Sequence, residues 1–176
     1  MRRNTKRPGG EAQGTTAKAV IKSPRNGRRT GTEGAARKAG TKGTTRSTAM
    51  RKADEAFSLF IRTRDSQMFG GKAFRCISCG RVLPISSADC GHYVNRQHMS
   101  LRYSELNCNA QCQKCNRFDE GNAQGYREGL IAKIGEPKVE MLEVMKHNTY
   151  KLSAFELEAI ARHYKEETKK FEWQIK

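Results

Sequence analysis

The sequence predicts a small α+β domain over residues 50–176, preceded by a disordered basic tail over residues 1–49. Three observations carry this prediction. Positive charge is concentrated near the N-terminus, apolar residues recur at helical spacing on both sides of a central stretch, and that stretch holds two C-x-x-C pairs. No apolar run approaches the ~20 residues that a membrane span needs, and no secretory signal is visible. We therefore expect a cytoplasmic protein with no membrane partner.

The N-terminal tail differs sharply from the rest of the chain in charge. Residues 1–52 contain 15 Lys and Arg against 2 Asp and Glu, whereas the remaining residues contain 19 against 16. The tail has no Leu and no aromatic residue, so it cannot bury enough apolar surface to offset its chain entropy. Basic arms of this kind release counterions when they meet phosphates, which favours contact with DNA. The alternatives are a solvated tail without a partner, or an upstream stretch ahead of a true start at Met50.

Helices are predicted on both sides of the central stretch. The first runs from Arg51 to Met68, ends at the glycines of "FGGK" (69–72), and has an apolar face of Ala53, Phe57, Phe60, Ile61 and Met68. Residues 75–120 form an irregular region, with short strands expected at "RVLPI" and "CGHYV".

Three more helices are predicted after residue 120. One ends at Gly135, the next has Pro137 in its first turn, and the last opens with a capping box formed by Ser153 and Glu156. Their apolar faces predict that the helices pack on the metal centre.

The doubled cysteine motif predicts that metal centre. Cys76 and Cys79 form one pair, Cys112 and Cys115 the other, and Gly80 suits the turn after the first pair. Four thiolates leave no coordination position for water, so we expect a structural Zn²⁺ site. Such a site binds with about 10–16 kcal/mol of apparent free energy, enough to decide folding. Four unliganded thiols or an iron–sulfur cluster are the alternatives. Disulfides are disfavoured because no secretion signal is visible.

The segment between the cysteine pairs holds side chains suited to phosphodiester hydrolysis. They are Asp89, His92, His98, Glu105 and Asn107, and Asn116 follows the last cysteine. Histidine acts as a general base near neutral pH, and carboxylate and amide oxygens suit Mg²⁺ or Mn²⁺. A histidine in a metal-binding domain can equally be structural. Cys90 and Cys108 stay unassigned, with small core positions as one reading.

The order of these motifs resembles a known family. "CISCG", "D-x-GHY", "LRYSELN" and "QCxxCN", followed by "YRxxLIxxIG", are similar to the pattern of the phage NinG (Rap) recombination endonucleases. The resemblance covers about residues 50–172 and extends to the zinc-stabilised HNH, or ββα-metal, nucleases. Phage endonuclease VII likewise has an asparagine directly after its last zinc cysteine.

The resemblance implies a role for each matching position. His92 would be the general base, Asn107 would hold the hairpin and orient His92, and Asn116 would bind the catalytic divalent ion. Many HNH enzymes have an acidic ligand just before the base, where this chain has Gly91. The ligand role is therefore assigned to Asp89, with His98 and Glu105 as substitutes.

The implied function is a metal-dependent endonuclease that cuts branched recombination intermediates such as Holliday junctions and D-loops. One alternative is a zinc-stabilised DNA-binding protein without cleavage, and another is an HNH nickase acting on duplex DNA. The C-terminal helices would supply either a homodimer interface or ordinary core. Phage recombination proteins are further partners that the resemblance suggests.

Overall fold

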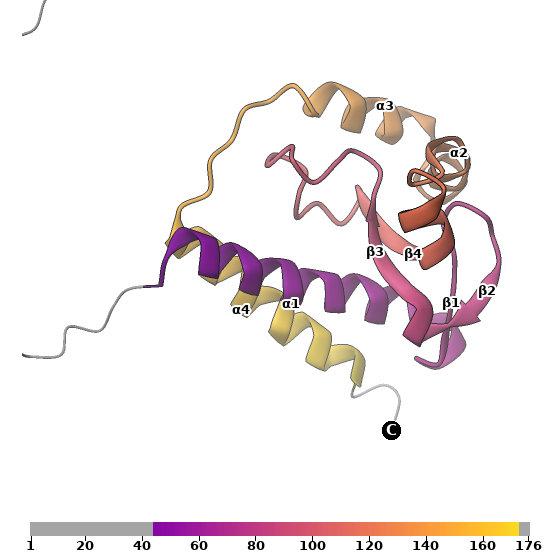
Figure 1. Cartoon of the computed structure of the whole chain (residues 1–176), viewed down its shortest axis with the longest axis horizontal. Coiled ribbons are helices and arrows are strands. Elements are labelled where there is room, and N and C mark those ends of the chain that lie inside the picture. Colours follow the sequence, from indigo (N-terminus) through magenta and orange to yellow (C-terminus); the bar gives the residue numbers. More distant parts are fainter. Residues whose placement is uncertain (1–43, 173–176) are drawn as a thin grey trace, which may run out of the picture. The chain divides into compact units, whose positions relative to one another are not determined.

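The computed structural model of the protein describes residues 44–172, so most of the predicted tail lies outside the described residues. The four α-helices are α1 (Arg46–Ser66), α2 (Ala123–Ile134), α3 (Glu136–Met145) and α4 (Ala154–Glu172) (Figure 1). The four strands are β1 (Ala73–Arg75), β2 (Val82–Pro84), β3 (Ala88–His92) and β4 (Cys108–Cys112). The predicted α+β class is confirmed. No helix within residues 44–172 is both long and apolar enough to cross a membrane.

Helix α1 begins and ends earlier than the sequence predicts. Thr45 caps its N-terminus by accepting a hydrogen bond from the Thr48 N–H, and Ala49 is fully buried. The predicted start of this helix at Arg51 is thus wrong by several residues, and a chain that began at Met50 would lack this cap. At the other end the chain tightens into a 3₁₀ turn over Gln67–Phe69, so Met68 turns outward and is 80% exposed rather than buried.

Helices α1 and α4 form the largest apolar core. They lie side by side and run in the same direction (Figure 1). Aromatic rings join them: the Phe57 and Tyr164 ring centroids are 4.7 Å apart, and those of Phe60 and Phe171 are 5.8 Å apart. The predicted capping box at the start of α4 is confirmed, because Ser153 N–H donates to the Glu156 carboxylate and Glu156 N–H donates to Ser153 Oγ.

Two antiparallel hairpins carry the residues between α1 and α2. Strand β1 pairs with β2, and β3 pairs with β4 with Ala88 opposite Cys112 and His92 opposite Cys108. Strand β2 confirms the prediction at "RVLPI". Strand β3 includes the first half of "CGHYV" but starts earlier. Strand β4 was not predicted because its sequence, "CNAQC", has no β-branched or aromatic residue. The region expected to be irregular therefore contains the central hairpin.

Helices α2 and α3 follow the prediction closely. Gly135 has a φ of 86° between them, and Pro137 lies in the first turn of α3. Their buried side chains form a separate core with Leu101 from the β3–β4 loop. Of the two, α2 contacts the cysteine loop directly: a Cβ on Gly129 would lie 1.9 Å from the carbonyl oxygen of Ile77.

Candidate metal centre and active site

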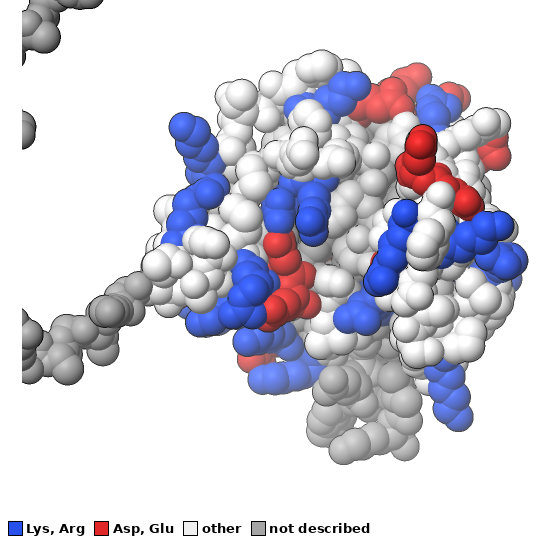
Figure 2. All heavy atoms as spheres, in the orientation of Figure 1, with Lys and Arg blue, Asp and Glu red and all other residues white. Residues whose placement is uncertain are grey.

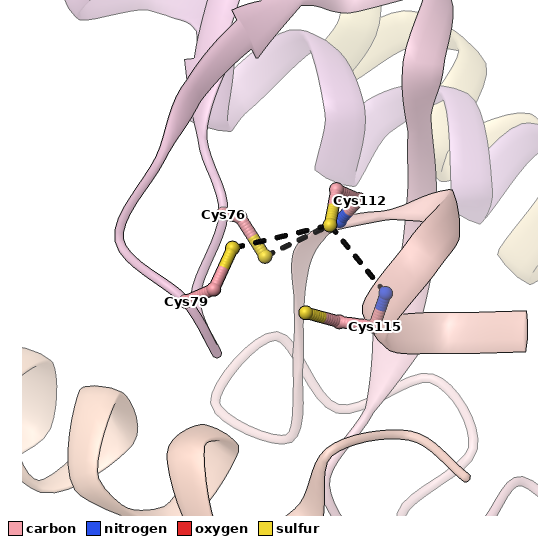
Figure 3. Close-up of side chains that lie close together, drawn as sticks. All are labelled: Cys76, Cys79, Cys112 and Cys115. Atoms are coloured by element: carbon pink, nitrogen blue, oxygen red, sulfur yellow. Dashed lines mark hydrogen bonds between the residues drawn. The ribbon is translucent and has the colours of Figure 1, made fainter. Parts of the chain in front are cut away.

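The four cysteines of the two C-x-x-C pairs converge in space. Their sulfur atoms all lie within 4.8 Å of one another, and those of Cys79 and Cys112 are 4.0 Å apart (Figure 3). Cys76 and Cys79 come from the loop after β1, while Cys112 ends β4 and Cys115 lies in the short π-helical segment Lys114–Phe118. The arrangement can hold one metal ion with four soft ligands, which suits Zn²⁺.

Surrounding hydrogen bonds support ionised sulfur at this cluster. Backbone N–H groups donate to sulfur, from Cys112 to Cys76 at 3.3 Å and from Cys115 to Cys112 at 3.5 Å. Burial alone would raise the pKa of Cys79, but hydrogen bonds from Arg81 and the neighbouring thiols lower it to about 6. Burial raises the pKa of Cys76, so a dication that compensates its charge is the favourable way to ionise all four thiols.

His92 lies at the far end of the same hairpin, where β3 meets the long loop. Its Nε2 is 3.1 Å from the Arg102 carbonyl oxygen, which can only accept, so Nε2 carries the proton and Nδ1 holds the lone pair. Burial lowers the pKa of His92 below its ordinary value, and the positive charges of Arg102 and Arg96 act in the same direction. The imidazole is thus held neutral and able to accept a proton at neutral pH.

Asn107 fastens the loop that follows His92. It is fully buried; its Oδ1 accepts from Val94 N–H at 2.7 Å, and its Nδ2 donates to the carbonyls of Val94 and Leu101. The Asn107 carbonyl oxygen accepts from Tyr93 N–H, next to His92. Asn107 therefore fixes both ends of the loop and reaches His92 through the backbone rather than by a side-chain contact.

Asp89 and Asn116 contact each other across the hairpin. Asn116 Nδ2 donates to Asp89 Oδ2 at 3.0 Å, while Arg117 donates to both carboxylate oxygens at 2.7 Å. Burial alone would raise the pKa of Asp89, but Arg117 and Asn116 hold it below the ordinary value. Asn116 Oδ1 accepts no hydrogen bond from residues 44–172, so it offers an oxygen to a hard cation. Asp89 thus contacts the predicted cation ligand Asn116, but its carboxylate is paired with Arg117.

A glutamine occupies the space beside Gly91, the residue directly before His92. A Cβ added to Gly91 would lie 2.3 Å from Gln111 Oε1, closer than real Cβ contacts allow. The Gln111 amide is held there by donating to Ser78 Oγ at 2.7 Å and to the Gly121 carbonyl at 2.6 Å. Gly91 is thus required by packing, which explains why no acidic side chain precedes the histidine.

One pocket joins the predicted base and the predicted cation ligand. It has a volume of about 570 Å³, and His92 and Asn116 both line it, together with Cys90, Tyr93 and Arg96. The two substitutes for Asp89 lie elsewhere. His98 Nδ1 is bonded to the Lys146 carbonyl at 2.8 Å, and Glu105 accepts from Tyr164.

Comparison with known proteins places the chain in a family. The family model described as "Bacteriophage Lambda NinG protein" matches residues 7–173. The chain belongs to the NinG family. Protein ninG of Escherichia phage lambda is 35% identical over 125 residues, which are 70% of this chain and 57% of that protein. Protein ninG of Escherichia phage 933W is also 35% identical over 125 residues, which are 58% of its length. The chain thus spans a little over half the length of these relatives. No solved structure matches it.

The structure of this NinG-family chain adds site residues that the sequence did not reveal. Arg96 lines the pocket, and Arg117 binds Asp89. Cys90 and Cys108, left unassigned from sequence, lie beside His92. A signal existed only for Arg117, which directly follows Asn116. The others depend on the register of β3 against β4. On the face shown in Figure 2, Lys and Arg side chains spread widely among interspersed acidic ones.

Proposed function

We propose that this NinG-family protein is a metal-dependent endonuclease of the HNH, or ββα-metal, type. The observation that supports the proposal is the shared pocket: the half-buried His92, whose pKa burial lowers, and Asn116 line the same 570 Å³ space. A base that takes a proton from water and a hard cation that compensates phosphate charge are the two requirements of phosphodiester hydrolysis. Strands β3 and β4 with the short helix after Cys112 would be the ββα core.

His92 performs the proton transfer in this mechanism. Nδ1 accepts a proton from the water that attacks phosphorus, and Nε2–H stays bonded to the Arg102 carbonyl oxygen, which stabilises the imidazolium formed. Asn107 acts as a positioning residue because it fixes the loop that supplies this carbonyl. Arg96, exposed at the pocket, suits contact with a backbone phosphate.

The cation ligands would be Asn116 Oδ1 and, when it turns partly from Arg117, the Asp89 carboxylate. When bound, Mg²⁺ or Mn²⁺ supplies positive charge that stabilises the pentacovalent phosphate and the leaving 3′ oxygen. The zinc cluster holds the other end of the hairpin, so β3 and the segment carrying Asn116 are presented rigidly.

The substrate that the family resemblance favours is branched DNA, such as a Holliday junction or a D-loop, in the cytoplasm of the phage host. The basic tail would add phosphate contacts, with an affinity that falls as salt rises. A homodimer would place two such sites on the two strands of a symmetric junction. Other phage recombination proteins are the partners we expect to deliver the substrate.

A second candidate is a zinc-stabilised DNA-binding protein without cleavage. The bidentate Arg117–Asp89 pair favours it, because both carboxylate oxygens are already engaged. The two candidates differ in the effect of removing His92: the nuclease would lose cleavage, whereas the DNA-binding protein would change at most in stability.

The test is cleavage of a labelled four-way junction and a matched linear duplex, with Mg²⁺ or Mn²⁺, by wild type, His92→Ala and His98→Ala. We expect wild type and His98→Ala to cut the junction, and His92→Ala to bind it but cut about 10²–10⁴-fold more slowly. All three proteins must contain equal zinc, so that lost activity reports chemistry. If the proteins bind every substrate but cut none, the nuclease proposal fails and the DNA-binding protein without cleavage is supported. If only the duplex is nicked, the HNH nickase is supported.

A further inference from the structure

A second group of metal-ligating side chains surrounds His92. Cys90 Sγ, Cys108 Sγ and a ring nitrogen of His92 all lie within 4.8 Å of one another. Within residues 44–172 this group and the four-cysteine cluster are the only two such groups of three or more. Nothing in the nuclease mechanism uses the two thiols.

The hairpin register builds this group. His92 lies directly opposite Cys108, and Cys90, two residues before His92, has its side chain on the same face of β3. Zn–S bonds of about 2.3 Å and Zn–N bonds of about 2.0–2.1 Å need ligand atoms slightly closer than 4.8 Å. The ligand atoms of both groups meet the same limit of 4.8 Å, and within the four-cysteine cluster the Cys79 and Cys112 sulfurs are 4.0 Å apart.

The chemistry of the three ligands selects the cation. Two thiolates and an imidazole bind Zn²⁺ or another thiophilic ion well and Mg²⁺ poorly. Three protein ligands leave a fourth position open, and the site is reachable because Cys90 and His92 line the 570 Å³ pocket. Such a site exchanges its ion more readily than a closed four-thiolate site.

We propose that Cys90, His92 and Cys108 form a second, exchangeable zinc site whose occupancy switches the nuclease off; the switch, though not the binding, rests on the proposed function. On binding, both thiols release their protons to solvent and the ion takes the single lone pair of the neutral imidazole. The other ring nitrogen then keeps its proton, whichever nitrogen is ligated. His92 can no longer accept a proton from water.

Zinc stoichiometry tests the site without reference to cleavage. Wild type, Cys90→Ser, Cys108→Ala and the control His98→Ala are equilibrated with excess Zn²⁺, desalted, and assayed for bound metal. We expect two zinc ions per chain for wild type and His98→Ala, and one for each cysteine variant. A mild chelator should remove the second ion first. One ion in wild type, or two in Cys108→Ala, would overturn the proposal.

Cleavage then tests the switch. Each protein is compared with its own rate when only the four-cysteine site carries zinc, one ion per chain, at fixed Mg²⁺. Stoichiometric Zn²⁺ should slow wild type and His98→Ala at least tenfold, reversibly with chelator, and the cysteine variants less than twofold. Full cleavage by a protein that carries two zinc ions would overturn the switch while leaving the site. If no protein cuts any substrate, the proposed nuclease function fails, and the metal count still decides whether the site exists.

Discussion

The two ends of the β3–β4 hairpin carry two different metal-ligating clusters. At the Ala88–Cys112 end, four thiols face one another. At the His92–Cys108 end, two thiols and an imidazole lie together; Cys90 and His92 line a pocket, and Cys108 is buried behind them. Both clusters use the same short pairing of strands. The two clusters differ in ligand number and access: four ligands leave no open position and would hold a structural cation, whereas three ligands beside a pocket would hold an exchangeable one.

The surroundings of the two clusters reinforce this difference. At the four-thiolate end, the buried Phe74 and Ala110 pack against the cysteines, and Gly129 lets α2 approach the Ile77 carbonyl. At the other end the loop is held by the Asn107 amide, and His92 and Cys90 remain at a pocket wall. Variants at each end should therefore fail in different ways.

Removing a ligand from the closed end should have the largest effect. Cys112→Ser leaves only three thiolates in a site whose zinc binding is worth about 10–16 kcal/mol to folding. We therefore expect the variant to lose zinc and to be unfolded already at about 25 °C, with no cooperative transition on heating. Metal content and circular dichroism measure this. Cys90→Ser is the control and should keep one zinc and a folded hairpin. A Cys112→Ser protein that melts like wild type would show that zinc is dispensable for the fold.

Asn107→Ala should break the open end while sparing the closed one. The variant leaves the Val94 N–H and the carbonyl groups of Val94 and Leu101 buried without their hydrogen-bond partner. This should lower the free energy of unfolding by about 3–4 kcal/mol. Urea titration measures the loss, and the structural zinc should stay bound below the transition. Asn95→Ala, at an exposed position on the same loop, should change stability by less than about 0.5 kcal/mol. Equal effects of the two variants would contradict the role of Asn107.

Gly91→Ala probes the strand between the two clusters. The added methyl group meets Gln111, whose amide would lose its bonds to Ser78 and Gly121, at a cost of about 2–3 kcal/mol. The matched experiment repeats the substitution in a Gln111→Ala background, where the obstacle is gone and the cost should fall below about 1 kcal/mol. If the double variant loses as much stability as the two single variants together, the methyl group at position 91 does not act through Gln111.

Periodicity and ligand spacing made most of the helices and the four-cysteine cluster predictable. The capping box at Ser153, the stop at Gly135 and the convergence of the two cysteine pairs each depend on local patterns that the structure keeps. Met68 departs from its predicted face because the last turn tightens into a 3₁₀ form, which apolar spacing does not encode.

Strand β4 and the second cluster were beyond prediction for a different reason. "CNAQC" is buried at every position although four of its five residues are polar or can ionise. Distant segments supply the hydrogen-bond partners of its amides, such as Tyr126 and Ser78. Without β4 there is no register, and without the register nothing brings Cys108 opposite His92. The contact between Asp89 and Arg117 depends on the same pairing.

Asp65 connects α1 to the middle of β4. Of the four substitutions, the one at Asp65 should reduce stability least. Burial alone would raise its pKa, but Arg64, Lys133 and the Ala110 N–H hold the pKa below its ordinary value, so the ionised form stabilises the fold. Asp65→Asn keeps an acceptor for Ala110 yet loses the charge, which should cost about 1–2 kcal/mol at pH 7 with zinc content unchanged.

The matched control for this last variant is Glu105→Gln. Glu105 approaches the same arginine, Arg64, at 3.9 Å, but its side chain is 46% exposed where that of Asp65 is 12% exposed. Solvent screens the exposed pair, so the control should change the free energy of unfolding by less than about 0.5 kcal/mol. If Asp65→Asn and Glu105→Gln lose the same free energy of unfolding, then the charge of Asp65, and not its burial, determines how much it stabilises the fold. A change in zinc content of Asp65→Asn would show that the middle of the hairpin is coupled to its closed end.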